Sequence, residues 1–253
     1  MSPLLSSGVA VDLVALSKEY RSDWRRPPVG ALTALQLQVP AGQIYGLIGP
    51  NGSGKSTALK LMAGLLRPTA GSCRVGGYAA GSPAARALVG FLPEAPQFPR
   101  FLTAREFLNY CGGLSGLDGI SLGQRITEVL AWAGLESVAD RTIGTYSKGL
   151  AQRLGLAQAV LHDPAIVLLD EPASGLDPIG VRDLTRLILR LKQTGKTVIL
   201  TSHFLAQMEE VCDRVALLHE GRLLREGPLA DLAGASGGRL ERLYLENIGD
   251  VVQ

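Results

Sequence analysis

A glycine-rich segment, GPNGSGKST at residues 49–57, constrains this chain more than any other feature of its sequence. It fits the pattern G-x-x-x-x-G-K-[ST], follows the apolar run QIYGLIG and continues into the helical run STALKLMAGLL. In that setting the glycines let backbone N–H groups turn toward phosphate oxygens at a helix N-terminus. The segment therefore predicts a strand, a phosphate-binding loop and a helix, in that order.

Each residue of this loop has an expected role in binding ATP. The Lys55 ammonium is expected to contact the β and γ phosphates, and the Ser56 hydroxyl to reach a Mg²⁺ ion that bridges them. The predicted ATP-binding residues are Gly49, Pro50, Asn51, Gly52, Ser53, Gly54, Lys55, Ser56 and Thr57. The alternative is a glycine-rich strand-to-helix turn that binds nothing.

Two adjacent carboxylates end a second apolar run, AIVLLDEP at residues 165–172. Such charges are costly at the end of a buried strand unless a cation or a polar reactant compensates them. Asp170 is expected to hold Mg²⁺ through water, and Glu171 to orient or deprotonate the water that attacks the γ-phosphate. The alternative is a solvated strand end followed by a helix cap.

Three short apolar runs, at residues 43–49, 165–170 and 196–203, have the composition of strands buried on both faces. Between the last two, a helix signal begins at Asp177 and ends near Gly195. Strand, helix and strand in this order predict a right-handed crossover. We therefore expect a doubly wound α/β sheet that binds ligands at the carboxyl ends of its strands.

The remaining segments suggest smaller units around this sheet. Residues of about 99–159 have helical spacing and no convincing strand, which predicts an inserted helical subdomain. The opening stretch to about Pro40 and the piece at 215–227 are typical of antiparallel β structure. We expect one ATPase domain over residues 1–230 and a short C-terminal extension over 231–253.

Composition excludes several classes of protein. A formal net charge of +2 gives no basic excess, so we expect no nucleic-acid partner. The separated cysteines Cys73, Cys111 and Cys212 indicate neither a disulfide framework nor a zinc site, and they favour a reducing cytosol. From the opening residues MSPLLSSGVAVDLVAL we expect no secretory leader, and no window approaches the roughly 18 apolar residues of a membrane span. If the protein serves a membrane, we expect another chain to cross it.

The segment YSKGLAQRL at residues 146–154 resembles the signature of the ATP-binding subunits of ATP-binding cassette (ABC) transporters, usually written LSGGQ with a QR pair after it. The resemblance covers nearly the whole chain. It implies a P-loop NTPase fold with a mostly parallel RecA-like core, an antiparallel β subdomain and the inserted helical subdomain. It also implies a dimer in which Ser147, Lys148 and Gly149 meet the γ-phosphate held by a second copy. From the residues alone, Ser147 is a helix N-cap.

Two further features carry over from the family. The segment SGLDP at 174–178 is similar to the D-loop, which implies that Asp177 couples the two sites across the dimer interface; alone, it is a helix cap. His203 matches the switch histidine that reaches the γ-phosphate in relatives. His162 and His219 have no such context, and we assign them to packing or to the surface.

An aromatic residue upstream of the phosphate loop in the family stacks on adenine, and Tyr20 in LSKEY resembles it. The eight residues RSDWRRPP at 21–28 look like an insertion relative to the family. Trp24 within that insertion is the alternative stacking residue, or it faces solvent.

The sequence departs from the family pattern at two positions. Relatives commonly have Gln after the strand that follows the phosphate loop, where it touches Mg²⁺, and GFLPEAPQ places Glu94 there. Glu94 can also ligate Mg²⁺ but adds negative charge beside the triphosphate, and Gln97 is a possible substitute. Lys148 replaces a glycine of the signature. Both departures resemble a subgroup whose permeases are often exporters.

These observations predict an ATPase that converts ATP and water to ADP and phosphate, with ATP and Mg²⁺ as cofactors. The expected catalytic residues are Glu171, His203 and Lys55, and the expected metal residues are Ser56, Asp170 and Glu94. We expect a second copy and a separate membrane permease as partners, and a peripheral location on the cytoplasmic face. The alternatives are a cassette that drives a mechanical or maturation complex in the membrane, a nucleic-acid or ribosome-associated cassette, and a phosphoryl-transfer kinase.

Overall fold

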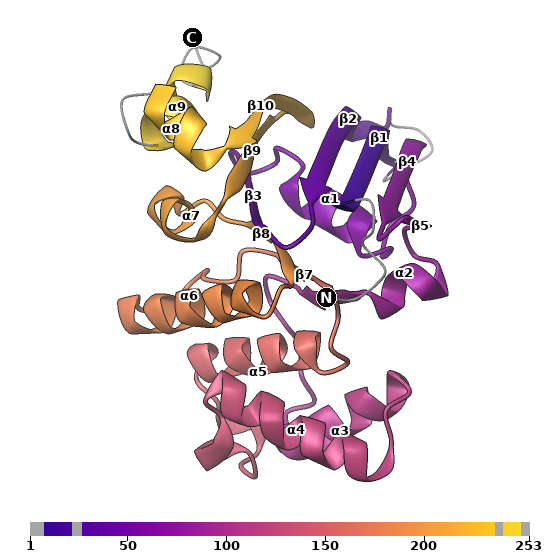
Figure 1. Cartoon of the computed structure of the whole chain (residues 1–253), viewed down its shortest axis with the longest axis vertical. Helices are drawn as coiled ribbons and strands as arrows, with labels where there is room; N and C mark the ends of the chain where they lie inside the picture. Colours follow the sequence, from indigo (N-terminus) through magenta and orange to yellow (C-terminus); the bar gives the residue numbers. More distant parts are fainter. Residues whose placement is uncertain (1–7, 22–26, 236–239, 249–253) are drawn as a thin grey trace.

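The computed structural model describes residues 8–21, 27–235 and 240–248, and Figure 1 shows two sheets with helices around them. One sheet has the strand order β2-β1-β4-β5 and is antiparallel throughout. Its strands are β1 (Val9–Tyr20), β2 (Val29–Pro40), β4 (Ala70–Val75) and β5 (Tyr78–Ala79). The antiparallel structure predicted for the opening stretch is confirmed, and the pair β4–β5 joins it.

The second sheet has the order β10-β9-β3-β8-β7-β6 and is parallel except for β10. Its strands are β3 (Ile44–Ile48), β6 (Val89–Leu92), β7 (Ile166–Leu169), β8 (Thr197–Thr201), β9 (Arg214–His219) and β10 (Arg222–Pro228). Every residue of β3, β7 and β8 is buried, as their apolar runs predict. The crossover from β7 to the adjacent parallel strand β8 passes through a helix, so the predicted α/β topology is confirmed.

The antiparallel structure predicted for the piece at 215–227 is confirmed, and the structure adds which sheet this hairpin joins. β10 does pair antiparallel with β9, but β9 runs parallel to β3 and so belongs to the six-stranded sheet. An antiparallel hairpin can extend a parallel sheet as its edge, and the apolar pattern alone does not tell which sheet the hairpin joins.

Nine α-helices and two 3₁₀ turns surround the sheets in the described part of the chain. They are α1 (Lys55–Met62), α2 (Pro83–Ala87), α3 (Ala104–Leu114), α4 (Gly119–Ala133), α5 (Lys148–Val160), α6 (Pro178–Gln193), α7 (Leu205–Val211), α8 (Leu229–Ala235) and α9 (Leu240–Ile248), with 3₁₀ turns η2 (Glu136–Val138) and η3 (Ile143–Thr145). The stretch at 99–159 contains helices and no strand, as predicted, and α3 to α5 lie at the far end of the molecule from β10 (Figure 1). In the described part of the C-terminal extension, α9 packs against α7.

Two apolar cores cover the faces of the six-stranded sheet. One surrounds α1 and fills the space between the two sheets, with Leu59 and Met62 of α1 packed among residues of β1, β2 and β3. The other joins the opposite face to the remaining large helices, and Leu154 of α5 and Ile188 of α6 are fully buried in it. Within the described residues, no helix has the length and apolar composition to cross a membrane.

Close glycine contacts set α5 against the edge strand β6. A Cβ atom on Gly90 of β6 would lie 1.9 Å from the Ala159 carbonyl oxygen of α5. A Cβ atom on Gly155 of α5 would lie 2.5 Å from a methyl carbon of Leu92 in β6. Both contacts require the absence of a side chain, so the helix and the strand approach at a distance that only glycine allows.

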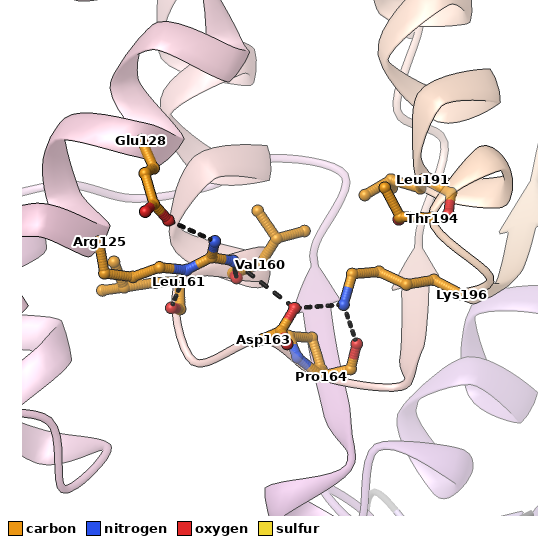
Figure 2. Close-up of polar contacts among 9 residues, drawn as sticks. All are labelled: Arg125, Glu128, Val160, Leu161, Asp163, Pro164, Leu191, Thr194 and Lys196. Carbon is orange, nitrogen blue, oxygen red and sulfur yellow. Dashed lines mark hydrogen bonds and ion pairs between the residues drawn. The ribbon is translucent and has the colours of Figure 1, made fainter. Parts of the chain in front are cut away.

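A cluster of charged side chains fixes the C-terminal end of α5 (Figure 2). The Arg125 guanidinium of α4 donates hydrogen bonds to the carbonyl groups of Leu161 at 3.0 Å and Val160 at 2.8 Å. Lys196, just before β8, binds Asp163 at 2.6 Å, and Asp163 lies 3.7 Å from Arg125. A cation at a helix C-terminus satisfies its last carbonyl groups. The cluster thereby joins the helical part of the chain to the parallel sheet.

The substitution Gly90→Ala tests the contact between α5 and β6. The added methyl group would overlap a backbone oxygen, so the helix must move away, and we expect a loss of about 1–3 kcal/mol in the free energy of unfolding. Gly113→Ala is the matched control, because a Cβ atom there meets nothing within 4 Å, and it should not lower stability. Chemical denaturation measures both values, and equal stability of the two variants would contradict the packing described.

Candidate functional site

The segment at 49–57 forms the predicted loop between β3 and α1. Gly52 and Gly54 have φ angles of 81° and 101°, in the left-handed region that favours glycine. A Cβ atom on Gly54 would lie 2.6 Å from the Ala31 carbonyl oxygen of β2. The loop is therefore held against the antiparallel sheet, and α1 begins directly after Gly54.

The Lys55 side chain points back into the loop. It is buried, and its ammonium donates a hydrogen bond of 2.8 Å to the Gly49 carbonyl oxygen. Burial lowers the pKa of Lys55, and the nearby charges of Glu171, Asp170 and Glu94 oppose that effect. Among the residues that the structure describes, this ammonium is hydrogen-bonded to the backbone carbonyl groups of Gly49 and Pro50, which leaves it available to an anion.

The turn between β9 and β10 is hydrogen-bonded to the phosphate-binding loop. Glu220 and Gly221 both have positive φ angles, 45° and 74°, as a two-residue type I′ turn requires. The Gly221 N–H donates to the Ser53 carbonyl oxygen at 3.1 Å, and Ser53 N–H donates to Pro50 at 3.2 Å. The buried Ser53 hydroxyl has no hydrogen-bond partner among the described residues. Such a group needs a partner, and a phosphate oxygen would supply one.

The buried carboxylate of Asp170 connects three segments of the site. Its Oδ1 atom accepts hydrogen bonds from the Ser56 hydroxyl at 2.7 Å and from the Thr201 hydroxyl at 2.9 Å. Thr201, at the end of β8, also accepts a hydrogen bond of 2.8 Å from the Glu171 N–H. Hydrogen bonds to Asp170 Oδ1 and to the Thr201 hydroxyl oxygen therefore hold the first turn of α1 and the ends of β7 and β8 together.

Glu171 and His203 form a contact beside this network. Nδ1 of His203 lies 2.7 Å from Oε2 of Glu171, and the His203 backbone N–H also donates to that oxygen at 3.3 Å. Glu171 is buried and has a φ angle of 45°, which is strained for a residue other than glycine. The His203 ring packs against Phe204 with 4.1 Å between ring centroids. The strained backbone directs the Glu171 side chain toward His203.

These residues surround a cavity of about 340 Å³. The lining residues are Ala31, Asn51, Gly52, Ser53, Gly54, Lys55, Ser56, Thr57, Glu94, Glu171 and His203. Most of the sequence-predicted phosphate loop thus meets Glu94, Glu171 and His203 around one space. Gln97, the alternative to Glu94, is not among the lining residues.

The polar groups beside Ser56 fit a magnesium ion. Ser56 and Asp170 offer hydroxyl and carboxylate oxygens at one point, and Glu94 lines the same cavity. Mg²⁺ prefers such hard oxygen ligands and usually keeps several waters or phosphate oxygens. In the described ranges no group of three or more His, Cys, Asp or Glu residues could hold a metal ion by itself, so phosphate and water would complete the shell.

The signature and D-loop residues lie outside this cavity in the same chain. Ser147 caps α5, and its hydroxyl accepts a hydrogen bond of 3.3 Å from the Leu150 N–H. Asp177 caps α6 through a 2.7 Å bond from the Gly180 N–H. Both residues therefore make the helix caps that the sequence predicts, and neither they nor Gly149 line the space around Lys55.

Lys148 lies beside a second cavity, of about 230 Å³. Glu94 lines both cavities. The two residues that depart from the family pattern, Glu94 and Lys148, therefore both line the second cavity. Gln152 also lines it, and its buried Nε2 group has no hydrogen-bond partner in the part of the chain that the structure describes.

Tyr20 lies at the end of β1, near the phosphate loop. Its hydroxyl is 3.3 Å from the Thr57 hydroxyl, and the Lys18 ammonium lies 5.4 Å from the centroid of its ring. The ring is 41% exposed, which leaves a face available, although Tyr20 does not line the 340 Å³ cavity. Trp24, the alternative, lies outside the described residues.

Sequence reasoning assigned no role to Thr201 or to Ala31. The Thr201 hydroxyl could be inferred from its place at the end of a parallel strand, next to Ser202 and His203. Ala31 offers no chemical signal, because only its backbone approaches the loop. His162 is hydrogen-bonded to the Val89 carbonyl oxygen at 3.1 Å, and burial lowers its pKa.

Comparisons with known proteins show which family the chain belongs to. Residues 32–174, which include the phosphate loop and Glu171, match the family described as ABC transporter. An ABC transporter ATP-binding protein of Synechocystis sp. is 42% identical over 254 residues, 94% of this chain and 71% of that protein. The Nod factor export ATP-binding protein I of Rhizobium sp. is 36% identical over 223 residues, 87% of this chain and 71% of that protein. A solved dimeric ATP-binding cassette in a post-hydrolysis state, bound to ADP and Pi, has a TM-score of 0.78 at 27% identity and covers 87% of this chain and 98% of its own.

The substitution Thr201→Val tests the Asp170 network. It removes a donor to Asp170 and the acceptor for the Glu171 N–H, so we expect a loss of about 1–3 kcal/mol in unfolding free energy and weaker binding of ATP with Mg²⁺. Thr197→Val, on the same strand, removes only an acceptor for the Gly42 N–H and should leave nucleotide affinity unchanged. Denaturation and a fluorescent ATP analogue measure the two effects. Equal nucleotide affinities in the two variants would show that Thr201 does not organise the site.

Proposed function

We infer, from the premise that this chain belongs to the ABC transporter family and is its ATP-hydrolysing subunit, that it drives a separate membrane permease through ATP sites shared by two copies. The single observation that carries this proposal is the meeting of Glu171 and His203 with the phosphate loop around one cavity. A phosphate-binding loop alone only binds nucleotide, whereas a strained carboxylate beside it can activate water.

The proposed reaction is an in-line displacement at the γ-phosphate. Water forms a bond to phosphorus, the bond from phosphorus to the β–γ bridging oxygen breaks, and ADP leaves with that electron pair. Glu171 orients the water and accepts its proton, while His203 holds the Glu171 carboxylate in place. Lys55 and the loop N–H groups bind the β and γ phosphates. A magnesium ion, held by Ser56 with Asp170 and Glu94 nearby, would neutralise charge on these phosphates.

The position of the α5 and α6 termini supports the dimer. Ser147, Lys148 and Gly149 begin α5, Asp177 caps α6, and none of them lines the cavity around Lys55 in its own chain. A helix N-terminus favours a bound phosphate, so the α5 terminus has the chemistry to meet the γ-phosphate of a second copy. The dimeric cassette structure described above is consistent with this arrangement.

We also propose that the permease transports a solute, and that it exports it. The relative of Rhizobium sp. is named for Nod factor export, and Glu94 and Lys148 resemble an exporter-like subgroup. The permease would be a separate integral membrane chain, with this subunit on its cytoplasmic face. Purification from native membranes and identification of the stoichiometric partner tests this part; a partner without membrane spans would contradict it.

The substitution Glu171→Gln tests the catalytic assignment. The amide cannot accept the water proton, so we expect hydrolysis to fall by about 10²-fold or more while ATP binding persists and ATP holds two copies together. A phosphate-release assay and analytical ultracentrifugation measure these effects.

Glu136→Gln is the control, because it removes an exposed carboxylate on η2 and should leave hydrolysis and association unchanged. Near-normal turnover of the Glu171 variant would mean that another group activates the water.

A further inference from the structure

We propose that Arg153 and Asp183 are positioning residues of the shared ATP site, because their ion pair fixes the start of α5 relative to the start of α6. The inference rests on the proposed function, since those two helix starts carry Ser147 and Asp177. Neither Arg153 nor Asp183 lines the 340 Å³ cavity, so they act through the helices and not on the nucleotide.

The two helix starts are built in the same way. Ser147 and Asp177 are N-caps with extended backbone, and each side chain accepts a hydrogen bond from the N–H three residues later. Such a cap fixes the direction of the first turn and of its free N–H groups. The position of each helix therefore sets where its cap lies relative to a second copy.

The ion pair joins the helices at equal distances from these caps. Nη2 of Arg153 lies 2.5 Å from Oδ2 of Asp183, and each side chain is only 27% exposed. Arg153 follows Ser147 by six residues, and Asp183 follows Asp177 by six, which is about 9 Å along each helix. A partly buried contact so close to both ends leaves little freedom for one helix to slide or tilt against the other.

Arg153 also contacts a third helix. A Cβ atom on Gly134, which ends α4 with a φ angle of 67°, would lie 3.1 Å from Nη1 of Arg153. The guanidinium thus lies over the C-terminus of α4, where its positive charge is favourable. The Arg153 guanidinium contacts Asp183 through Nη2 and the end of α4 through Nη1. These contacts on two sides fix the rotamer of Arg153.

A second contact holds the same two segments together nearer to the caps. The Lys148 side chain lies over Gly175 in the SGLDP segment, and a Cβ atom there would be 2.1 Å from Nζ of Lys148. Gly175 has a φ angle of 68°, in the left-handed region that favours glycine, and the absence of a side chain leaves room for the Lys148 ammonium. The residue that departs from the usual signature therefore packs on the loop that precedes Asp177.

The consequence is that Ser147 and Asp177 move as one unit when a second copy approaches. When a second copy binds, the phosphate contact of α5 and the interface contact of α6 then form together. Without the ion pair, each contact forms independently of the other. Ser147 alone would still cap its helix, and the phosphate loop would still bind ATP in its own chain.

A double-mutant cycle in the Glu171→Gln background tests this role. We measure the ATP-dependent dimerisation constant for Arg153→Gln, for Asp183→Asn and for both together. Each single change should weaken dimerisation about tenfold, and the double variant should be no weaker than either single one, because all three lack the same pair. Arg153→Lys should recover part of the loss. ATP binding to the monomer, measured by fluorescence, should stay unchanged.

The pair Arg105–Asp140 provides the control, because it is a more exposed Arg–Asp ion pair of 2.9 Å within the helical part of the chain and does not join α5 to α6. Arg105→Gln should leave dimerisation unchanged. A fall in melting temperature at Arg153 without weaker dimerisation, or additive losses in the cycle, would overturn the inference. If the Glu171→Gln parent itself does not dimerise with ATP, that result contradicts the proposed shared site and, with it, this inference.

Discussion

The carboxylate of Asp170 is buried at the end of β7, and its hydrogen bonds to Ser56 and Thr201 join the phosphate loop to two parallel strands. A buried charge with hydroxyl donors alone is costly, and a cation at this point would compensate it. Thr201 also accepts the Glu171 N–H, which helps to hold that residue at a φ angle of 45°. The buried Asp170 carboxylate, the proposed metal site beside it and the strained backbone of Glu171 are therefore linked by the same hydrogen bonds. These bonds set the position of Glu171.

The packing of α5 bears on the proposed contact with a second copy. Glycine contacts at Gly90 and Gly155 bring the C-terminal half of α5 close to β6, and Arg125 binds the last carbonyl groups of the same helix. The residues at the N-terminus of α5, Ser147 to Gly149, do not line the cavity around Lys55 in their own chain. A capped helix N-terminus outside its own cavity suits contact with the phosphate of a second copy, as the proposed mechanism requires.

Much of this fold could be predicted from short apolar runs, because strands buried on both faces need continuous apolar residues, as in β3, β7 and β8. The strand ends then placed the phosphate loop, Asp170, Glu171 and His203 at one edge. Thr201 was missed because a threonine in a β-branched run is also a common strand residue. The partnership of Arg153 with Asp183, and the sheet that β9 and β10 join, depend on how distant segments pack, which local patterns do not specify.

Complementation between two inactive variants tests the shared site most directly. Lys55→Met removes the ammonium that binds phosphate in its own chain, whereas Ser147→Asp keeps a helix cap but sets negative charge against the partner's γ-phosphate. A mixed dimer has one site with both defects and one site with neither. We therefore predict that ATP hydrolysis, absent from each variant alone, returns when the two are mixed. If the mixture stays as inactive as its components, each chain does not supply Ser147 to the other's nucleotide, and the account is wrong.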